Sequence, residues 1–320
     1  MHRDVRVFHP ASPSSSYRSD GMKRYAPASM QEARNLAVFL ITCPDRKGIV
    51  ATVSTFFFER GFNILHCQQH TDRLESRFFM RILVDLDSAP CSRRELIDGF
   101  SSVAKPFSIQ WSAHFCADPQ RIGILATREP HCLHDLLSRA DTGDLPNSKV
   151  ALVISNHPEL ESVAARFSVP FFCCRIDRND RRLQETEVVG LLRQHHVQLA
   201  VLARYMQVLS GEMLNEITIP VINIHHGFLP AFEGAGPYRR AWERGVKMIG
   251  ATAHYVTPQL DGGPIIEQDV ERVTHEDGVE ALQRTGRDIE SIVLARAVKA
   301  HLEHRVMVHA NRAVVFSAGA

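Results

Sequence analysis

The chain has 320 residues, of which 44% are hydrophobic and 23% charged; this is the composition of an ordinary globular protein, and the length suggests two domains. A formal net charge of +1 gives no basis for binding nucleic acid or a membrane, so neither is expected as a partner. No apolar run reaches the roughly 20 residues that a membrane helix needs. The seven cysteines form no CxxC pair and the 17 histidines show no metal pattern, so we expect free thiols, no bound metal and a cytoplasmic location.

Residues 1–33 show no core-forming period. They combine prolines with a run of serines, which predicts a flexible leader. The arginine and serine content also occurs in transit peptides, but Asp4 and Asp20 argue against that interpretation.

From Asn35 onward, short apolar runs alternate with helical periods. The pattern predicts strands at 35–42, 63–70, 77–87 and 107–115, and helices at 49–60 and 93–105. This βαββαβ order is satisfied most simply by two helices packed on one face of a four-stranded antiparallel sheet, as in ferredoxin-like folds. We assign residues 34–117 to this first domain.

After residue 118, apolar strands and helices alternate to the end of the chain. Strands are predicted at 121–126, 149–155, 169–174, 198–204, 221–225 and 249–256. Helices are predicted at 131–140, 158–167, 181–196, 206–216, 238–244 and 277–303. This alternation predicts an α/β, Rossmann-like domain over residues 118–320, with a doubly wound parallel sheet covered on both faces.

Two polar side chains, Asn223 and His225, end the apolar strand at 221–225. Residues two apart on a strand share a face, and open α/β sheets form ligand crevices at the carboxyl ends of their strands. An amide and an imidazole can both donate to the oxyanion of acyl transfer. Farther on, Asp261 lies in a Leu-Asp-Gly-Gly-Pro turn, where a carboxylate beside a histidine would favour the imidazolium and relay a proton. Each residue alone is more often structural, so the chemistry depends on their joint occurrence.

Several motifs point to one known family. Residues 221–264 contain NIHH, AF-x-GA-x-PY, GATAHYV and LDGGP, and residues 153–157 and 203–210 read VISNH and ARYMQVLS. These motifs resemble the deformylase branch of the formyltetrahydrofolate-dependent formyltransferase superfamily. The CPDRKGIV and GFNIL segments of the first domain resemble an ACT module, and an ACT module fused in front of this catalytic domain is specific to that branch.

The resemblance implies that Asn223, His225 and Asp261 are catalytic and that no metal is required. It also implies hydrolysis of 10-formyltetrahydrofolate to formate and tetrahydrofolate, which supplies formate for purine synthesis and balances the one-carbon folate pool. Asp261 would deprotonate the attacking water, directly or through His225, while Asn223 and His225 stabilise the oxyanion. The implied folate contacts are Arg204, Tyr205, Met206, Gln207, Val208, Leu209, His254, Val256, Thr257 and Leu260. Simple core positions remain an equal alternative for Met206 and Leu209.

The ACT resemblance implies regulation by a small amino acid, methionine or glycine. The expected effector contacts are Asp45, Arg46, Gly48, Ile49 and Asn63. ACT modules usually pair their sheets between chains, so a homo-oligomer is expected. The alternative is that the module only dimerises and binds no effector.

Two other functions stay open: formyl transfer to an amine acceptor such as glycinamide ribonucleotide, and a folate- or amino-acid-binding regulator without turnover. The transformylase binds its acceptor's phosphate on a glycine-rich loop after the first strand. Residues 127–133 contain no glycine, and Glu129 would repel phosphate, which favours water as the acceptor. Gly227 stands where these families usually have serine, and Gly262 where the deformylase branch commonly has a larger polar residue.

Overall fold

The computed structural model describes residues 35–87, 91–176, 180–230 and 237–318. The predicted leader and residues 231–236 of the AF-x-GA-x-PY motif therefore lie outside the described residues. None of the helices within the described ranges has the length and apolar character needed to cross a bilayer.

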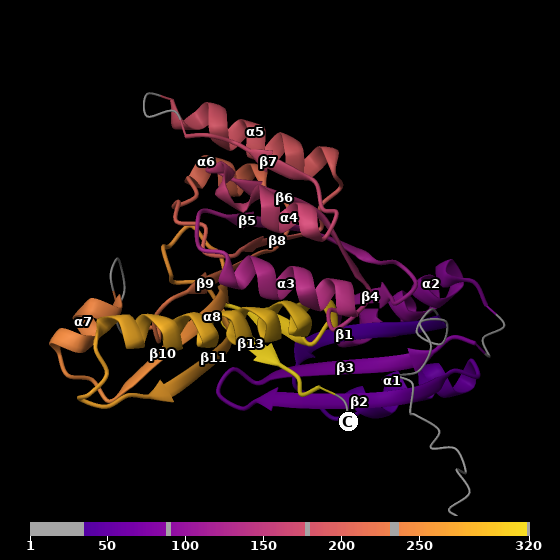
Figure 1. Ribbon diagram of the computed structural model, residues 1–320. Coiled ribbons are helices and arrows are strands. Elements are labelled where there is room, and N and C mark those ends of the chain that lie inside the picture. The colour runs from indigo at the N-terminus through magenta and orange to yellow at the C-terminus, as the bar shows by residue number, and fades with distance from the viewer. Residues whose placement is uncertain (1–34, 88–90, 177–179, 231–236, 319–320) are drawn as a thin grey trace, which may run out of the picture.

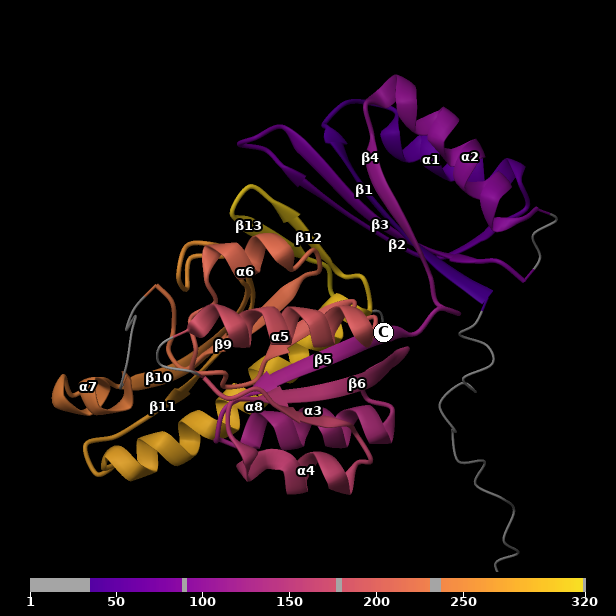
Figure 2. The same ribbon diagram turned by 90° about the horizontal axis from the view of Figure 1, so that it is seen from above.

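The first domain has the predicted antiparallel sheet with two helices on one face (Figures 1 and 2). Its strands, in the spatial order β2-β3-β1-β4, are β1 (Leu36–Pro44), β2 (Asn63–Asp72), β3 (Arg77–Asp85) and β4 (Gln110–Phe115). The helices are α1 (Ile49–Glu59) and α2 (Arg93–Ala104), and a 3-10 turn, η2 (Lys105–Phe107), follows α2.

Local signals place both helices. Gly48 starts α1 with a φ of 93°, a left-handed conformation that glycine adopts without the clash of a Cβ atom. Ser92 and Glu95 form a reciprocal capping box at the start of α2. Between helices and sheet, the Phe39 ring lies 5.1 Å from that of Phe57, centroid to centroid. The apolar faces predicted from the sequence thus form one compact core.

The second domain is built on a seven-stranded mixed sheet with the order β11-β10-β9-β8-β5-β6-β7. Its strands are β5 (Gln120–Ala126), β6 (Ser148–Ser155), β7 (Phe171–Cys173), β8 (Leu199–Leu202), β9 (Val221–His225), β10 (Met248–Tyr255) and β11 (Ile265–Arg272). The predicted parallel pairing is confirmed for β5 to β9. However, β10 runs antiparallel to both β9 and β11, and the sequence did not predict β11.

Helices cover both faces of this sheet, as expected for a doubly wound fold (Figure 2). One face carries α3 (His131–Thr142), η3 (Pro158–Leu160), α4 (Glu161–Arg166) and α8 (Val279–Leu302), and the other carries α5 (Arg181–Gln194) and α6 (Gly211–Glu216). The short helix α7 (Pro237–Glu243) lies at the edge beside α8. The chain moves from β5 to β6 on one side and later returns to β8 on the other. Doubly wound sheets bind ligands near such a switch, beyond the carboxyl ends of the strands.

The C-terminal hairpin, β12 (Val306–His309) and β13 (Arg312–Val315), lies between the two domains and was not predicted (Figure 2). It covers the helix-free face of the ACT-like sheet, where Phe79 packs against Met307 and Phe316. Arg81 on β3, only 8% exposed, donates to the carbonyl oxygen of Glu303 at 2.9 Å, just past the end of α8. A buried guanidinium satisfying helix-end carbonyls fixes the ACT-like domain to the second domain.

Partly buried histidines gather at this junction. His304 stacks on His114 with ring centroids 3.9 Å apart. Burial lowers the pKa of His304 to about 3 and that of His301 to about 4. Both rings are therefore neutral in the folded protein at neutral pH.

These histidines predict acid destabilisation. The unfolded chain takes up protons near a pKa of 6.5 and the folded protein does not, so unfolding becomes easier as pH falls below that value. The loss reaches about 1.4 kcal/mol per pH unit for each histidine until the folded form is protonated too. We expect the His304→Asn variant to lose less unfolding free energy than the native chain between pH 7 and pH 5 in urea titrations. His275→Asn, at an exposed position, is the control and should behave like the native chain.

Candidate active site

A cavity of about 300 Å³ opens beyond the carboxyl ends of β8 and β9. Met206, Val208 and Leu260 expose 51%, 55% and 63% of their surface beside it. Apolar side chains exposed around a cavity mark a surface that holds an apolar ligand. All ten residues predicted to contact folate line this cavity, namely Arg204, Tyr205, Met206, Gln207, Val208, Leu209, His254, Val256, Thr257 and Leu260. The helix predicted at 206–216 begins only at Gly211, because the preceding residues form the cavity wall.

Asn223 and His225 both line the cavity from β9, as their spacing of two residues predicts. The antiparallel register with β10 places His254 opposite Asn223 and Thr252 opposite His225. The Asn223 amide nitrogen lies 3.2 Å from Nε2 of His254. Two polar pairs, Asn223 with His254 and His225 with Thr252, thus stand side by side on adjacent strands.

Asp261 bridges the two histidines. Its Oδ2 lies 3.2 Å from Nδ1 of His225, and its Oδ1 lies 3.6 Å from Nε2 of His254. Hydrogen bonds from His225 and then His254 hold the pKa of Asp261 well below its usual range, so the carboxylate is ionised at neutral pH.

The turn that carries Asp261 depends on its glycines. Asp261 itself has a left-handed φ of 51°, which is uncommon for a non-glycine residue and typical of functional sites. A Cβ on Gly263 would lie 1.8 Å from the carbonyl oxygen of Tyr255, so only glycine fits there. A Cβ on Gly262 would lie 2.5 Å from the side chain of Gln259. A larger residue at position 262 would therefore require the Gln259 side chain to move.

His225 is arranged to exchange a proton with a ligand. It is 4% exposed, and its Nδ1–H donates to Asp261. Its Nε2 is buried and has no hydrogen-bond partner among the residues that the structure describes. A carboxylate on one ring nitrogen fixes the tautomer that leaves a lone pair on the other.

His254 was expected only as a folate contact, but it also contacts both Asn223 and Asp261. Its Nδ1 lies 2.9 Å from the carbonyl oxygen of Tyr255, so Nδ1 carries a proton. Its Nε2 can accept from Asn223 or, once protonated, donate to Asp261. The sequence gives no direct signal for this role, because the register between β9 and β10 decides it.

Comparison with known proteins identifies the family of the chain. Residues 120–298 match the formyl transferase family, and residues 37–90 match the ACT domain family. The formyltetrahydrofolate deformylase of Synechocystis sp. is 47% identical over 88% of this chain and 98% of its own length. That of Bacillus subtilis is 46% identical over 94% and 99%. A crystal structure of a formyltetrahydrofolate deformylase from Pseudomonas syringae pv. tomato superposes with a TM-score of 0.85 at 45% identity, covering 88% of this chain and 94% of that one.

The chain belongs to the formyltetrahydrofolate deformylase family.

A buried ionic cluster lies next to the site of this deformylase-family chain and was not predicted. Glu290 on α8 is fully buried and accepts from His131 at 2.8 Å and from the Tyr238 hydroxyl at 2.5 Å. The Arg204 guanidinium lies 3.4 Å from the same carboxylate, and Arg204 has a left-handed φ of 62°. The cluster holds Arg204, the first residue of the cavity-lining segment 204–209, against α8.

His131, Cys132 and Glu290 also bring three possible metal-ligand atoms within 4.8 Å of one another. The guanidinium of Arg204 already neutralises the carboxylate, and two hydrogen bonds occupy its oxygens. A divalent cation would have to displace these partners against the charge of the guanidinium. The cluster therefore fits an internal ion pair better than a metal site.

The loop between β5 and α3 does not have the form of a phosphate cradle. It spans residues 127–130 and contains no glycine. The carboxylate of Glu129 lies 3.8 Å from Nδ1 of His131, the first residue of α3. The loop before α3 therefore offers no glycine-rich backbone to an acceptor's phosphate, and it carries an acidic side chain next to the start of the helix.

The five predicted effector contacts lie at two ends of the ACT domain. The loop with Asp45, Arg46, Gly48 and Ile49 precedes α1, whereas Asn63 follows it. An 11-residue helix spans roughly 16 Å, so one chain does not bring both ends to one small amino acid. Arg46 is engaged within its own chain, donating to the carbonyl oxygen of Pro106 at 2.6 Å.

Proposed function

We propose that this chain hydrolyses 10-formyltetrahydrofolate to formate and tetrahydrofolate, and so supplies formate for purine synthesis and balances the one-carbon folate pool. The observation that carries the proposal is the meeting of Asn223, His225 and Asp261 at one cavity with apolar walls. Membership of the deformylase family over almost the full length of its relatives supports the same reaction.

His225 acts as the base in the first step. A carboxylate with a strongly lowered pKa is a weak base, so Asp261 does not take the proton from water itself. Nε2 of His225 accepts that proton, and Asp261 stabilises the resulting imidazolium through Nδ1. Of the two routes that the sequence left open, the geometry favours the one through His225.

The oxyanion step uses the amide of Asn223. As hydroxide adds to the formyl carbon, negative charge develops on the formyl oxygen, and the Asn223 N–H group donates to it. The imidazolium of His225 then returns its proton to N10 of the folate. The bond between carbon and N10 breaks, and formate and tetrahydrofolate leave.

The test is a direct assay of the purified full-length chain with 10-formyltetrahydrofolate, with and without glycinamide ribonucleotide. We expect formate and tetrahydrofolate in equal amounts, unchanged by the amine. Because the loop between β5 and α3 contains no glycine and carries Glu129, no formylated ribonucleotide should form. Formylated product in place of formate would establish transfer, and folate binding without formate release would establish a regulator.

We further propose that residues 34–117 regulate and oligomerise the protein and that residues 118–320 catalyse. A homo-oligomer would let the Asp45 loop of one chain meet Asn63 of another, which a single chain does not allow. Methionine or glycine is the proposed effector. Calorimetry with each amino acid tests this, and no heat with either would favour an ACT domain that only dimerises. The free thiols of all seven cysteines support the proposed cytoplasmic location.

A further inference from the structure

The turn of the C-terminal hairpin contacts the catalytic loop. Residues Ala310 and Asn311 connect β12 to β13, and the side-chain amide of Asn311 donates to the carbonyl oxygen of Gly262 at 2.7 Å. Gly262 directly follows Asp261 in the chain. This hydrogen bond therefore holds the peptide unit between Gly262 and Gly263, one residue past the proposed catalytic Asp261.

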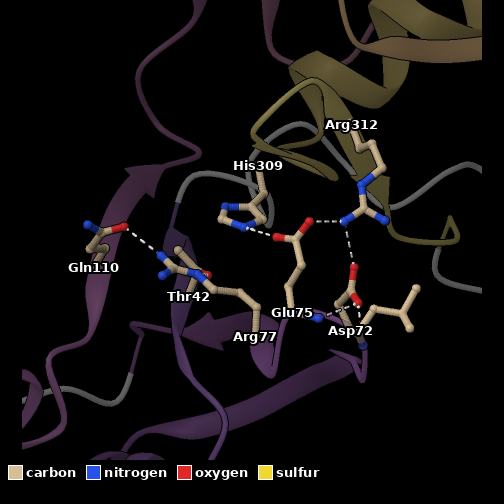
Figure 3. Close-up of polar contacts among 8 residues, drawn as sticks. Thr42, Asp72, Glu75, Arg77, Gln110, His309 and Arg312 are labelled. Atoms are coloured by element: carbon tan, nitrogen blue, oxygen red, sulfur yellow. Dashed lines mark hydrogen bonds and ion pairs between the residues drawn. The ribbon is translucent and has the colours of Figure 1, made fainter.

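The same hairpin is held by the ACT domain at the turn between β2 and β3. Figure 3 shows His309 and Arg312, which flank the hairpin turn, pointing toward Glu75. His309 Nε2 lies 2.5 Å from the Glu75 carboxylate, and Arg312 pairs with Glu75 and, at 2.9 Å, with Asp72. Asp72 and Glu75 of the ACT domain thus form ion pairs with the residues on both sides of the turn that carries Asn311.

Other contacts join the hairpin to the ACT domain away from its turn: Phe79 packs on Met307 and Phe316, and the Gln68 amide donates to the carbonyl oxygen of Ser317 at 3.2 Å. A cavity of about 560 Å³ separates β2 from β13, lined among others by Gln68, His70 and Val314. The apolar contact of Phe79 with the hairpin lies beside this cavity. At the hairpin tip itself, the ionic contacts with Asp72 and Glu75 join the turn to the ACT domain.

The β2–β3 turn is in turn tied to the proposed effector loop. The backbone N–H of Asp45 donates to the carbonyl oxygen of Ser76 at 2.7 Å, and Ser76 directly follows Glu75. Asp72 Oδ1 accepts from the backbone of Leu74 at 2.9 Å, which stiffens the turn. A continuous set of bonded groups therefore runs from the Asp45 loop to the Asp261 loop.

We propose that Asn311 is a positioning residue for Asp261, and that the β12–β13 hairpin transmits the position of the ACT domain's β2–β3 turn to the catalytic loop. The catalytic part of this inference rests on the proposed function. Asp261 reaches His225 at 3.2 Å only while its left-handed turn is held. A small displacement of that turn lengthens the contact and weakens support for the imidazolium.

Asn311→Ala tests the positioning role. We expect kcat for formate release to fall about tenfold, with KM for 10-formyltetrahydrofolate changed less than twofold, because a misplaced catalytic group costs rate rather than binding. Asn311→Asp, which keeps the shape but removes the donor, should be as poor, and Asn311→Ser should recover part of the rate. Val308→Ala, at a half-exposed position of the same hairpin, is the control and should leave kcat unchanged. Native kcat in both Asn311→Ala and Asn311→Asp overturns the role.

A second readout does not depend on turnover. Hydrogen exchange of peptides covering residues 257–264 should be at least severalfold faster in Asn311→Ala, because the loop loses an anchor. If the native chain releases no formate, the proposed function fails while this measurement still decides whether Asn311 holds the loop. Unchanged exchange overturns the inference even if the native chain is an active deformylase.

Glu75→Ala tests transmission from the ACT domain, with Arg73→Ala in the same turn as the control. We expect Glu75→Ala to lower kcat about threefold and to speed exchange at 257–264, although Glu75 touches no residue of that loop. In the double variant with Asn311→Ala, kcat should be no lower than in Asn311→Ala alone, because both changes break one connection. A double variant whose loss of kcat is the product of the two single losses overturns the transmission. A Glu75→Ala variant with native kcat and native exchange overturns it too.

Discussion

Replacing Asp261 with asparagine should lower kcat for formate release by roughly 1,000- to 10,000-fold with little change in KM. In the native site the carboxylate accepts the Nδ1 proton of His225 and leaves the lone pair of Nε2 free. An asparagine amide can donate to Nδ1 instead. That would place the proton on Nε2 and remove the base, and it would also remove the charge that stabilises the imidazolium.

The measurement is steady-state kinetics of formate release, combined with thermal unfolding to show that the variant folds. Asp269→Asn is the matched control. Asp269 lies on β11, where it pairs with Arg296 at 2.8 Å, and it does not line the cavity. An Asp261→Asn variant that keeps its rate within tenfold of the native chain would show that the carboxylate does not support the base.

Replacing Asn223 with alanine is expected to lower kcat by about 100- to 1,000-fold, the usual cost of losing one oxyanion donor. The effect falls on kcat rather than KM, because the donor meets full negative charge only in the transition state. Asn223→Asp is the sharper variant. It keeps the size of the side chain but replaces the donor with a group that repels the oxyanion, so its rate should be lower still.

Asn215→Ala on the exposed side of α6 is the control for this series and should retain the native rate. Folate binding measured by fluorescence quenching should persist in both Asn223 variants, since the cavity wall is intact. Rapid formate release by Asn223→Asp would exclude the amide as the donor and would direct attention to Nε2 of His254, 3.2 Å away.

Local sequence patterns determined much of this protein. The two-residue period of β9 was enough to place Asn223 and His225 on one face, because alternation along a strand is a property of the backbone itself. Alternating strands and helices likewise predicted the doubly wound sheet, with its crevice beyond the carboxyl ends of the strands. The family resemblance of the motif at 203–210 implied folate contacts there, and these residues line the cavity directly after a strand that ends at that crevice.

Only the tertiary structure decided which distant groups meet. The antiparallel register of β9 and β10 sets His254 against Asn223, and no local period encodes a register between strands. The same holds for Glu290, which is joined to Arg204 across the domain, and for Asn311, which reaches Gly262 from the chain's last hairpin. Such contacts depend on how whole elements pack against one another. The full sequence specifies that packing, but no single segment of it predicts the contacts.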